Sequence, residues 1–307
     1  MPSQAPAAVR AAGSQQPATA TGPSLAAAAG DEFGFERVSA DLSSTDAGSH
    51  PDFTADFVLE HEVVGKEFRS DNRTEEISIS LPPGLLGTPN AVSQCRTADL
   101  ITENCPIDSQ VGVTSVALVN HGDPESVWPV FNLEPPHPGL EVARFGFTPL
   151  GTFPAFIDVK VRTAKDYGVS ATVYGTSGFD SLIAAHTILW GDPSDPVHDR
   201  ERLPEEFCES GKFDCSVPRT GLAFMTNPSG CDEGQAGFAA RSYQLPGQVF
   251  EADAPLRSIA DCVGLPFVPS FEAEPTSHVA GAPTGLKTKL LLPPAPAGKR
   301  TLHRHHA

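Results

Sequence analysis

Short segments in which apolar and polar residues alternate recur along this 307-residue chain, and glycine, proline or aspartate separates them. "FTADFVL" at 53–59 shows the alternation, and "EISISL" at 76–81 repeats it before Pro82 and Pro83. Alternation with a period of two is typical of strands with one buried face, and proline ends a strand because it cannot donate to the hydrogen-bond ladder. The two segments therefore predict two strands, and the polar connection between them predicts that they pair as a hairpin.

Further segments of this kind predict an antiparallel fold. They lie at 109–119, 127–134, 141–149, 155–163 and 167–175, and shorter ones follow at 221–227, 238–245 and 265–275. The spacing favours a sandwich or barrel, because a βαβ fold would need helical patterns of about 10 to 15 residues between strands. Only a turn at 90–95 and the apolar segment 180–191, which fits a buried strand or a short helix, are candidates for helix. The predicted fold class is all-β, with antiparallel units of the β-sandwich type, long loops and few short helices.

The composition divides the chain into three parts. Residues 1–32 are rich in alanine, proline and serine, with too little apolar surface to offset the entropy of ordering, so we predict a disordered segment. Residues 33–284 form the β-rich body, either as one unit or as two lobes divided near the proline-broken stretch 191–220. Residues 285–307 are predicted to begin a truncated second unit with a basic, histidine-containing tail, because "GLKTKLLLPP" echoes "EEISISLPPG", which begins at Glu75.

The charge of the chain excludes two classes of partner. The sequence has 38 acidic and 21 basic residues, a formal net charge of −17. Nucleic acids and anionic membranes need a contiguous basic surface, so we expect neither as a partner. The sequence also has no apolar run of about 18 residues, the length of a membrane span, and we predict no membrane insertion.

Six cysteines decide the expected compartment: Cys95, Cys105, Cys208, Cys215, Cys231 and Cys262. None lies in a C-x-x-C pair, which argues against a zinc ribbon or a thioredoxin-like site and favours disulfides. Sequence alone leaves the connectivity open, although proximity favours Cys95 with Cys105, Cys208 with Cys215, and Cys231 with Cys262. Disulfides persist in oxidising compartments, so we expect an extracellular or cell-surface protein. Because residues 1–30 contain no export signal, the start codon is misplaced or the chain is a piece of a larger secreted polypeptide.

The densest cluster of chemically active side chains lies in "WGDPSDPVHDRER" and comprises Asp192, Asp195, His198 and Asp199. Carboxylates with one imidazole suit a divalent cation, and an aspartate–histidine pair suits acid–base chemistry. The alternative is an exposed loop of Asx turns, with Arg200 and Arg202 as local counter-ions.

Other motifs of catalysis are absent from the sequence. It has no Gly-x-Ser-x-Gly elbow, no Gly-x-Gly-x-x-Gly fingerprint and no P-loop, so we predict no catalytic residue and no cofactor. His186, within the apolar "LIAAHTILW", is predicted to be a hydrogen-bonded core histidine, and Trp190 a core residue.

Several motifs in one order resemble a known group of proteins: "SLPPGLLGTPNAVSQC", "CPIDSQVGV", "PVFNLEPPHPGLEVARFGF", "LWGDPSDPVHDRER" and "FMTNPSGC". The group consists of large secreted bacterial proteins built from long β-rich units, some with fibronectin-like or immunoglobulin-like modules, and the match spans about residues 48–290. The resemblance implies export, tandem architecture and a cell-surface role, and it supplies no catalytic residues.

Two functional hypotheses follow from these observations. The first is a non-catalytic secreted or cell-surface module with a structural, adhesive or glycan-contacting role, part of a larger tandem protein, with cell-wall glycan or other surface proteins as partners. The second is a secreted hydrolase that uses the acidic loop from Asp192 to Asp199, with or without a metal ion.

Overall fold

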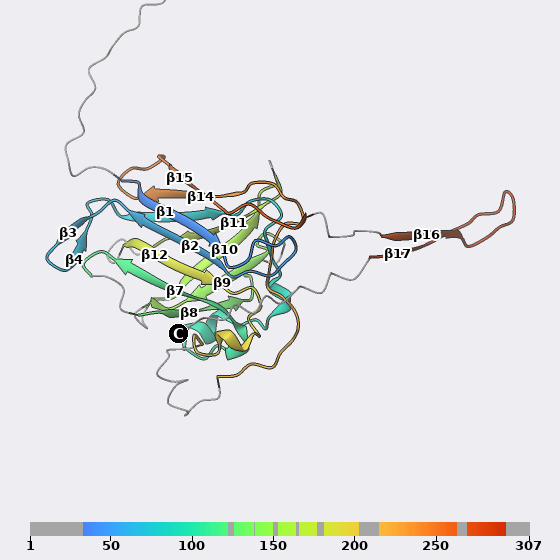
Figure 1. The fold of residues 1–307 in the computed structure, drawn as a ribbon, viewed down its shortest axis with the longest axis horizontal. Helices are drawn as coiled ribbons and strands as arrows, with labels where there is room; N and C mark the ends of the chain where they lie inside the picture. Colours follow the sequence, from blue (N-terminus) through green and yellow to red (C-terminus); the bar gives the residue numbers. More distant parts are fainter. Residues whose placement is uncertain are drawn as a thin grey trace, which may run out of the picture.

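A computed structural model describes residues 33–121, 126–137, 139–149, 153–163, 166–176, 181–202, 215–262 and 269–292. One antiparallel sheet of eleven strands forms the body, in the order β1-β2-β12-β7-β8-β9-β10-β11-β5-β14-β15 (Figure 1). The predicted all-β class is confirmed, and the ambiguous segment 180–191 contains strand β12. The predicted disordered segment, residues 1–32, lies outside the described residues.

The strands of the sheet are short, as the sequence pattern predicts. Their bounds are β1 (Phe35–Leu42), β2 (Phe53–Leu59), β5 (Thr74–Ser80), β7 (Gln110–Leu118), β8 (Trp128–Leu133), β9 (Ala143–Phe147), β10 (Ala155–Val161), β11 (Val169–Tyr174), β12 (Leu182–Leu189), β14 (Gln235–Ser242) and β15 (Phe250–Pro255).

Three two-stranded pairs and a few helical turns complete the described structure. The pairs are β3 (Glu62–Val64) with β4 (Glu67–Arg69), β6 (Leu86–Gly87) with β13 (Met225–Thr226), and β16 (Ser270–Pro275) with β17 (Leu286–Leu291). The helical turns are α1 (Thr97–Ile101), η1 (Pro89–Ala91), η2 (Ile107–Ser109) and η4 (Pro196–His198). In the part of the chain that the structure describes, no helix has the length and apolar character needed to cross a bilayer.

The large sheet curls on itself until its two edges meet. Strands β1 and β15 end the hydrogen-bonded order, yet they pack against each other. The rings of Phe33 and Phe250 meet edge to face there, with centroids 5.2 Å apart. The predicted sandwich-type body is therefore a single sheet nearly closed into a barrel. Strands from both sides of residues 191–220 belong to it, because β14 pairs with β5.

The predicted hairpin between residues 53–59 and 76–81 is wrong. Strand β2 pairs with β1 and β12, whereas β5 pairs with β11 and β14. The alternation in each segment identifies which face is buried, but it contains no information about the neighbouring strand. Between the two strands the chain forms the small β3–β4 hairpin instead.

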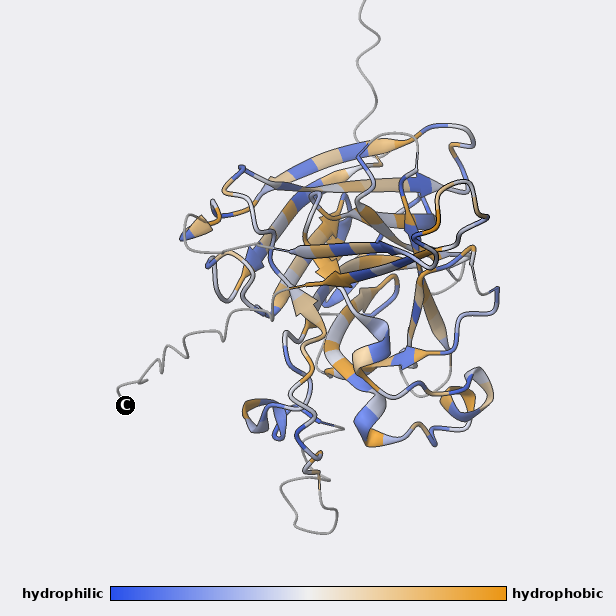
Figure 2. Cartoon of the chain, turned by 90° about the vertical axis from the view of Figure 1, so that its right-hand side faces the viewer, coloured by the Kyte–Doolittle hydropathy of each residue, from blue (hydrophilic) through white to orange (hydrophobic). Residues whose placement is uncertain are grey.

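The core lies inside the curled sheet and extends to its seam. Hydrophobic and hydrophilic residues alternate along the strands (Figure 2). Near the seam, the ring of Phe35 lies 6.1 Å from that of Phe57 and 6.0 Å from that of Phe238, both edge to face. Such aromatic contacts stabilise the packing beyond the area they bury.

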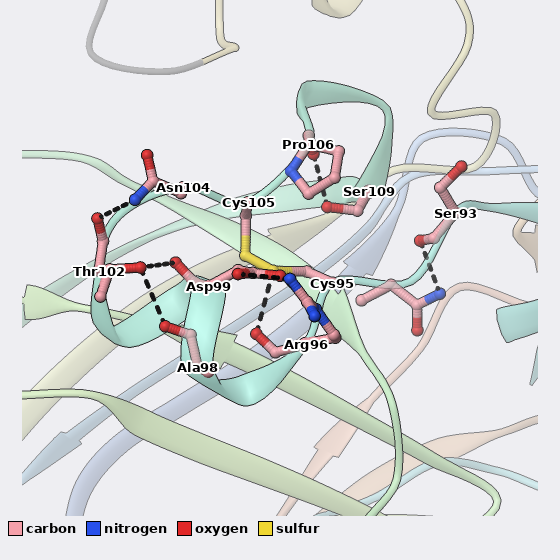
Figure 3. Close-up of a disulfide and its surroundings, with 11 residues drawn as sticks. Ser93, Cys95, Arg96, Ala98, Asp99, Thr102, Asn104, Cys105, Pro106 and Ser109 are labelled. Atoms are coloured by element: carbon pink, nitrogen blue, oxygen red, sulfur yellow. Dashed lines mark hydrogen bonds and ion pairs between the residues drawn. A yellow bond between two sulfur atoms is a disulfide. The ribbon is translucent and has the colours of Figure 1, made fainter.

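Two of the predicted disulfides are confirmed. Cys95 is bonded to Cys105 across helix α1 (Figure 3), and Cys231 to Cys262 across the β14–β15 hairpin. Cys215 is also disulfide-bonded, and its predicted partner, Cys208, lies outside the described residues.

Strands β16 and β17 form a hairpin that projects from the body (Figure 1). The predicted boundary between residues 284 and 285 falls inside it, since β17 pairs with β16, which precedes that boundary. Residues 293–307 lie outside the described residues.

Candidate functional site

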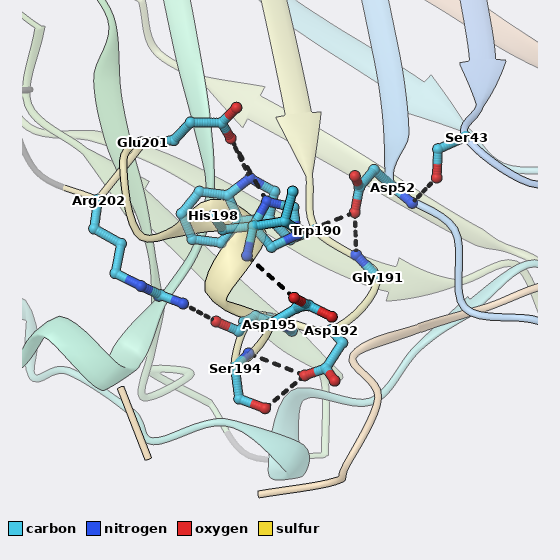
Figure 4. A network of polar contacts seen from close by, with 12 residues as sticks. Ser43, Asp52, Trp190, Gly191, Asp192, Ser194, Asp195, His198, Glu201 and Arg202 are labelled. Carbon is cyan, nitrogen blue, oxygen red and sulfur yellow. Dashed lines mark hydrogen bonds and ion pairs between the residues drawn. The ribbon is translucent and has the colours of Figure 1, made fainter. Parts of the chain in front are cut away.

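The acidic loop predicted from the sequence folds around Trp190, at the end of β12. Trp190 is fully buried, as predicted, and the imidazole of His198 lies against its indole, with ring centroids 4.6 Å apart (Figure 4). The indole nitrogen of Trp190 donates to Glu201 at 3.1 Å. This end of the sheet is thus closed by a packed aromatic and ionic cluster.

His198 is a buried cation in this cluster. Its Nε2 lies 3.5 Å from Asp52 and its Nδ1 lies 3.6 Å from Glu201. Burial lowers the pKa of His198, but hydrogen bonds and charges of Asp52 and Glu201 outweigh it and raise the pKa to about 9. A doubly protonated imidazole at pH 7 has no lone pair for a metal ion or a substrate proton. His198 is therefore a structural cation rather than a general base.

The three aspartates of the loop each bind a different partner. Asp192 accepts hydrogen bonds from the backbone and hydroxyl of Ser194, at 3.0 and 2.7 Å. Asp195 caps η4 by accepting from the backbone of Val197 at 3.1 Å, and it pairs with Arg219. The guanidinium of Arg202, which is fully buried, lies 3.1 Å from Asp199.

These contacts match the turn-and-counter-ion alternative in the sequence analysis. Asp192, Asp195, His198 and Asp199 are close in sequence, but their polar atoms do not converge on one point. Among the residues that the structure describes, no group of three or more histidine, cysteine, aspartate or glutamate side chains could hold a metal ion. In the structure this loop packs against the end of the sheet and stabilises it through these contacts. Sequence reasoning missed Asp52 and Glu201, which sit in a distant loop and at the end of the segment.

His186 does not occupy the core. Its side chain is 51% exposed and bonds to Asp56 of the neighbouring strand β2. The apolar sequence around it predicted burial, but in a strand such as β12 a residue and its two neighbours point to opposite faces. The imidazole therefore lies on the outer face of the sheet.

The structure contains a cavity inside the curled sheet that the sequence did not predict. Its volume is about 480 Å³, and the inward faces of β2, β5, β7, β9, β10, β11 and β12 form its walls. Beside this cavity, the rings of Phe35, Phe57 and Phe238 pack together in the hydrophobic core. The hollow is next to small side chains on the strands that form its walls: Ala55, Ala143, Ala155, Ala171 and Ala185.

The burial of the wall residues reflects this hollow. On β10 and β11 the inward side chains of Ile157, Ala171 and Val173 are only half-buried. The lining also includes Phe153, which is 51% exposed, so the cavity is open to solvent. An interior of this kind holds a ligand more readily than a close-packed core, in which few voids exceed one water molecule.

The walls are almost entirely apolar. Within the described part of the chain, no charged side chain lines the cavity, and its polar side chains are Thr114, Tyr174, Thr176 and Thr187. The hydroxyls of Thr114 and Thr187 bond to each other at 2.8 Å. The site can therefore take up apolar surface and offers few groups that could hold a polar molecule.

Comparison with known proteins adds no relative. No protein-family model matches the sequence, and no curated protein matches it significantly. The resemblance to large secreted bacterial proteins therefore remains a prediction.

Proposed function

We propose that this chain is a non-catalytic module of an exported protein and that the cavity in its curled sheet binds an uncharged, apolar ligand. The observation that supports the proposal best is the half-exposed inner face of β10 and β11, where apolar side chains line an open space. An apolar ligand would remove this surface from water, at about 25 cal/mol per Å² of buried area.

The chemistry of the walls selects the class of ligand. A glycan would have to lose its hydrogen bonds to water, and unpaired polar groups are costly in an apolar site. Two of the four hydroxyls in the lining already bond to each other. We therefore place a single alkyl-chain or small aromatic molecule in the cavity, whose volume of about 480 Å³ lies within the usual range for small-molecule sites.

The disulfides support export. Bonds between Cys95 and Cys105 and between Cys231 and Cys262 need an oxidising compartment to persist. A ligand-binding module outside the cell agrees with the cell-surface hypothesis from the sequence. The contacts of the loop from Asp192 to Asp199 do not favour the hydrolase alternative, because its imidazole is held as a cation.

The test is titration of the full chain with N-phenyl-1-naphthylamine, an uncharged dye that fluoresces in apolar surroundings. We expect saturable binding of one dye per chain. A long-chain alcohol should displace the dye and a disaccharide should not. Ala171→Phe, which puts a ring into the cavity from β11, should weaken dye binding at least tenfold.

The matched control is Ala239→Phe. Ala239 is on the outer face of β14, opposite Ser78 in the ladder, and does not line the cavity. The Ala239→Phe variant should bind the dye as tightly as the parent does, and both variants should melt cooperatively. Equal dye binding by Ala171→Phe and the parent, or displacement by the disaccharide but not the alcohol, would overturn the proposal.

A further inference from the structure

Two hairpins of the chain have loops of the same length and with a glycine of positive φ at the same position. The loop from β1 to β2 covers residues 43–52, and the loop from β16 to β17 covers residues 276–285, so both contain ten residues. Each has a glycine with positive φ at the sixth position: Gly48 at 66° and Gly281 at 73°. The two loops are offset by 233 residues, the difference between positions 276 and 43.

Four of the hydrogen bonds inside the two loops also lie at equivalent positions, and two of them join the ends of each loop. Across the first loop, the backbone of Ser43 donates to Asp52 and the backbone of Asp52 donates to the Ser43 hydroxyl, at 3.0 and 2.8 Å. Across the second, Thr276 and Gly285 make the same pair of bonds, at 2.9 and 2.8 Å.

Two further bonds inside each loop recur at the same offset. In the first loop, the backbone of Asp46 donates to the Ser44 hydroxyl and its carbonyl accepts from Ser49. In the second loop, the backbone of Val279 donates to the Ser277 hydroxyl and its carbonyl accepts from Ala282. Four equivalent bonds in loops of equal length indicate one hairpin design used twice.

The strands that flank the loops follow the same offset. Leu42 pairs with Phe53 in the first ladder, and Pro275 pairs with Leu286 in the second. The face that β1 and β2 turn toward the core consists of Val38, Ala40, Leu42, Phe53, Ala55 and Phe57; the face at the equivalent positions of β16 and β17 consists of Phe271, Ala273, Pro275, Leu286, Thr288 and Leu290. Each set is mostly apolar.

The two faces differ in burial. Phe53 and Phe57 are each 4% exposed, because the curled sheet covers them. Their equivalents, Leu286 and Leu290, are 69% and 59% exposed. The opposite face of the second hairpin bears Glu272 beside Lys289 and Glu274 beside Lys287, opposite charges in register, as suits a surface that stays in water. An isolated hairpin with one apolar face is marginally stable in water.

We propose that β16 and β17 are the opening hairpin of a second unit of this same fold, carried by the same polypeptide. The occupant of its apolar face is then known from the first unit. This occupant is the rest of the second unit's curled sheet. Its first strand would pair antiparallel with β17, as β12 pairs with β2 in the first unit. The sequence echo with residues 75–89 is superseded, because β5 pairs with β11 and β14 and has no such hairpin loop.

The test transplants the strands and keeps the first loop. Residues 37–42 are replaced by residues 270–275, and residues 53–59 by residues 286–292, in the full chain. The exchange turns Phe53 and Phe57 into leucine, so we expect a lower Tm. The variant should nevertheless melt in one cooperative transition, with amide exchange in β12 as slow as in the parent.

A register control uses the same residues shifted by one position. Residues 269–274 and 285–291 then take the two places, so that Lys287 and Lys289 occupy positions 55 and 57 on the core face. This variant should lose the cooperative transition and the protection of β12. If both variants lose them, the second hairpin does not fit the wall and the proposal is wrong.

A lengthened chain tests whether the rest of a second unit covers the apolar face of β16 and β17. In it, residues 60–262 follow Leu292 directly, which supplies the rest of a second unit. The amides of β16 and β17 should then exchange at least a hundredfold more slowly than in the parent chain. The parent itself should be a monomer at micromolar concentration. A parent dimer that the substitution Leu290→Lys dissociates would mean that a second copy covers the hairpin, and would overturn the proposal.

Discussion

Ile77 and Ile79 are two residues apart on β5 and point into the same curled sheet, yet Ile77 is 2% exposed and Ile79 is only half-buried. Both side chains border the cavity, but packed neighbours cover Ile77 almost completely, whereas Ile79 leaves part of its surface in the open space. Their positions locate where the close-packed part of the interior ends.

This pair provides a test of the cavity by stability alone. Ile77→Ala should lower the free energy of unfolding by about 3 kcal/mol, because it removes a packed side chain from the core. Ile79→Ala should cost about half as much, since part of its surface is already in the cavity. Urea unfolding of the two variants measures the difference. A cost for Ile79→Ala equal to that for Ile77→Ala would mean that no space lies beside Ile79.

His198 should make the stability depend on pH. Its pKa is about 9 in the folded chain and about 6.5 in the unfolded chain, so the stabilisation is complete below pH 6.5 and is lost as the pH rises through 9. We expect a loss of about 1 to 2 kcal/mol between pH 6 and pH 10, reduced by the partial exposure of Asp52 and Glu201. The measurement is urea unfolding across this range.

The control for this prediction is His198→Gln, which removes the charge and keeps a polar side chain. Other titrating groups are common to both chains and cancel in the comparison. The variant should be less stable than the parent at pH 6, and the gap should narrow by pH 10. Parallel curves for parent and variant would show that His198 is not held as a cation.

The sequence predicted individual strands better than their partners. The alternation at 53–59 identified both β2 and its buried face, because every second side chain is apolar. It did not identify β12 as a neighbour, since that pairing closes a connection of more than a hundred residues. Whether His186 is exposed depends on which residues of β12 face inward, and a continuous apolar run does not reveal this.

The cavity could not be predicted for a different reason. Alternation identifies Ala171 as inward-facing, but the space beside it depends on how tightly an eleven-stranded sheet curls. The acidic loop was predicted as a cluster by proximity in sequence. Its actual partners include Asp52, which comes from the loop between β1 and β2.

The disulfide between Cys231 and Cys262 should stabilise the fold more, through loop-closure entropy, than the disulfide between Cys95 and Cys105, because it closes the longer loop. Its cysteines are 31 residues apart, and the chain-entropy model gives about 4 kcal/mol for a loop of that length. We expect Cys231→Ala/Cys262→Ala to lose about 3 to 4 kcal/mol in urea unfolding, and to keep the fold. In the native parent, iodoacetamide should label neither cysteine until a reductant is added. Labelling without reductant would contradict both the bond and the export argument.

Gly112 on β7 should not tolerate a side chain. A Cβ at this position would lie 2.1 Å from the carbonyl oxygen of Ile188 on β12, so the two paired strands would have to separate. We expect Gly112→Ala to lower the free energy of unfolding by about 3 kcal/mol. The control is Gly237→Ala on β14, where the nearest atom, of Asp253, lies 3.4 Å from the added carbon. That change should shift stability by less than about 1 kcal/mol, because the space is open and alanine restricts the unfolded chain. If the two alanine variants unfold at the same urea concentration, β7 and β12 do not approach as closely as the structure has them.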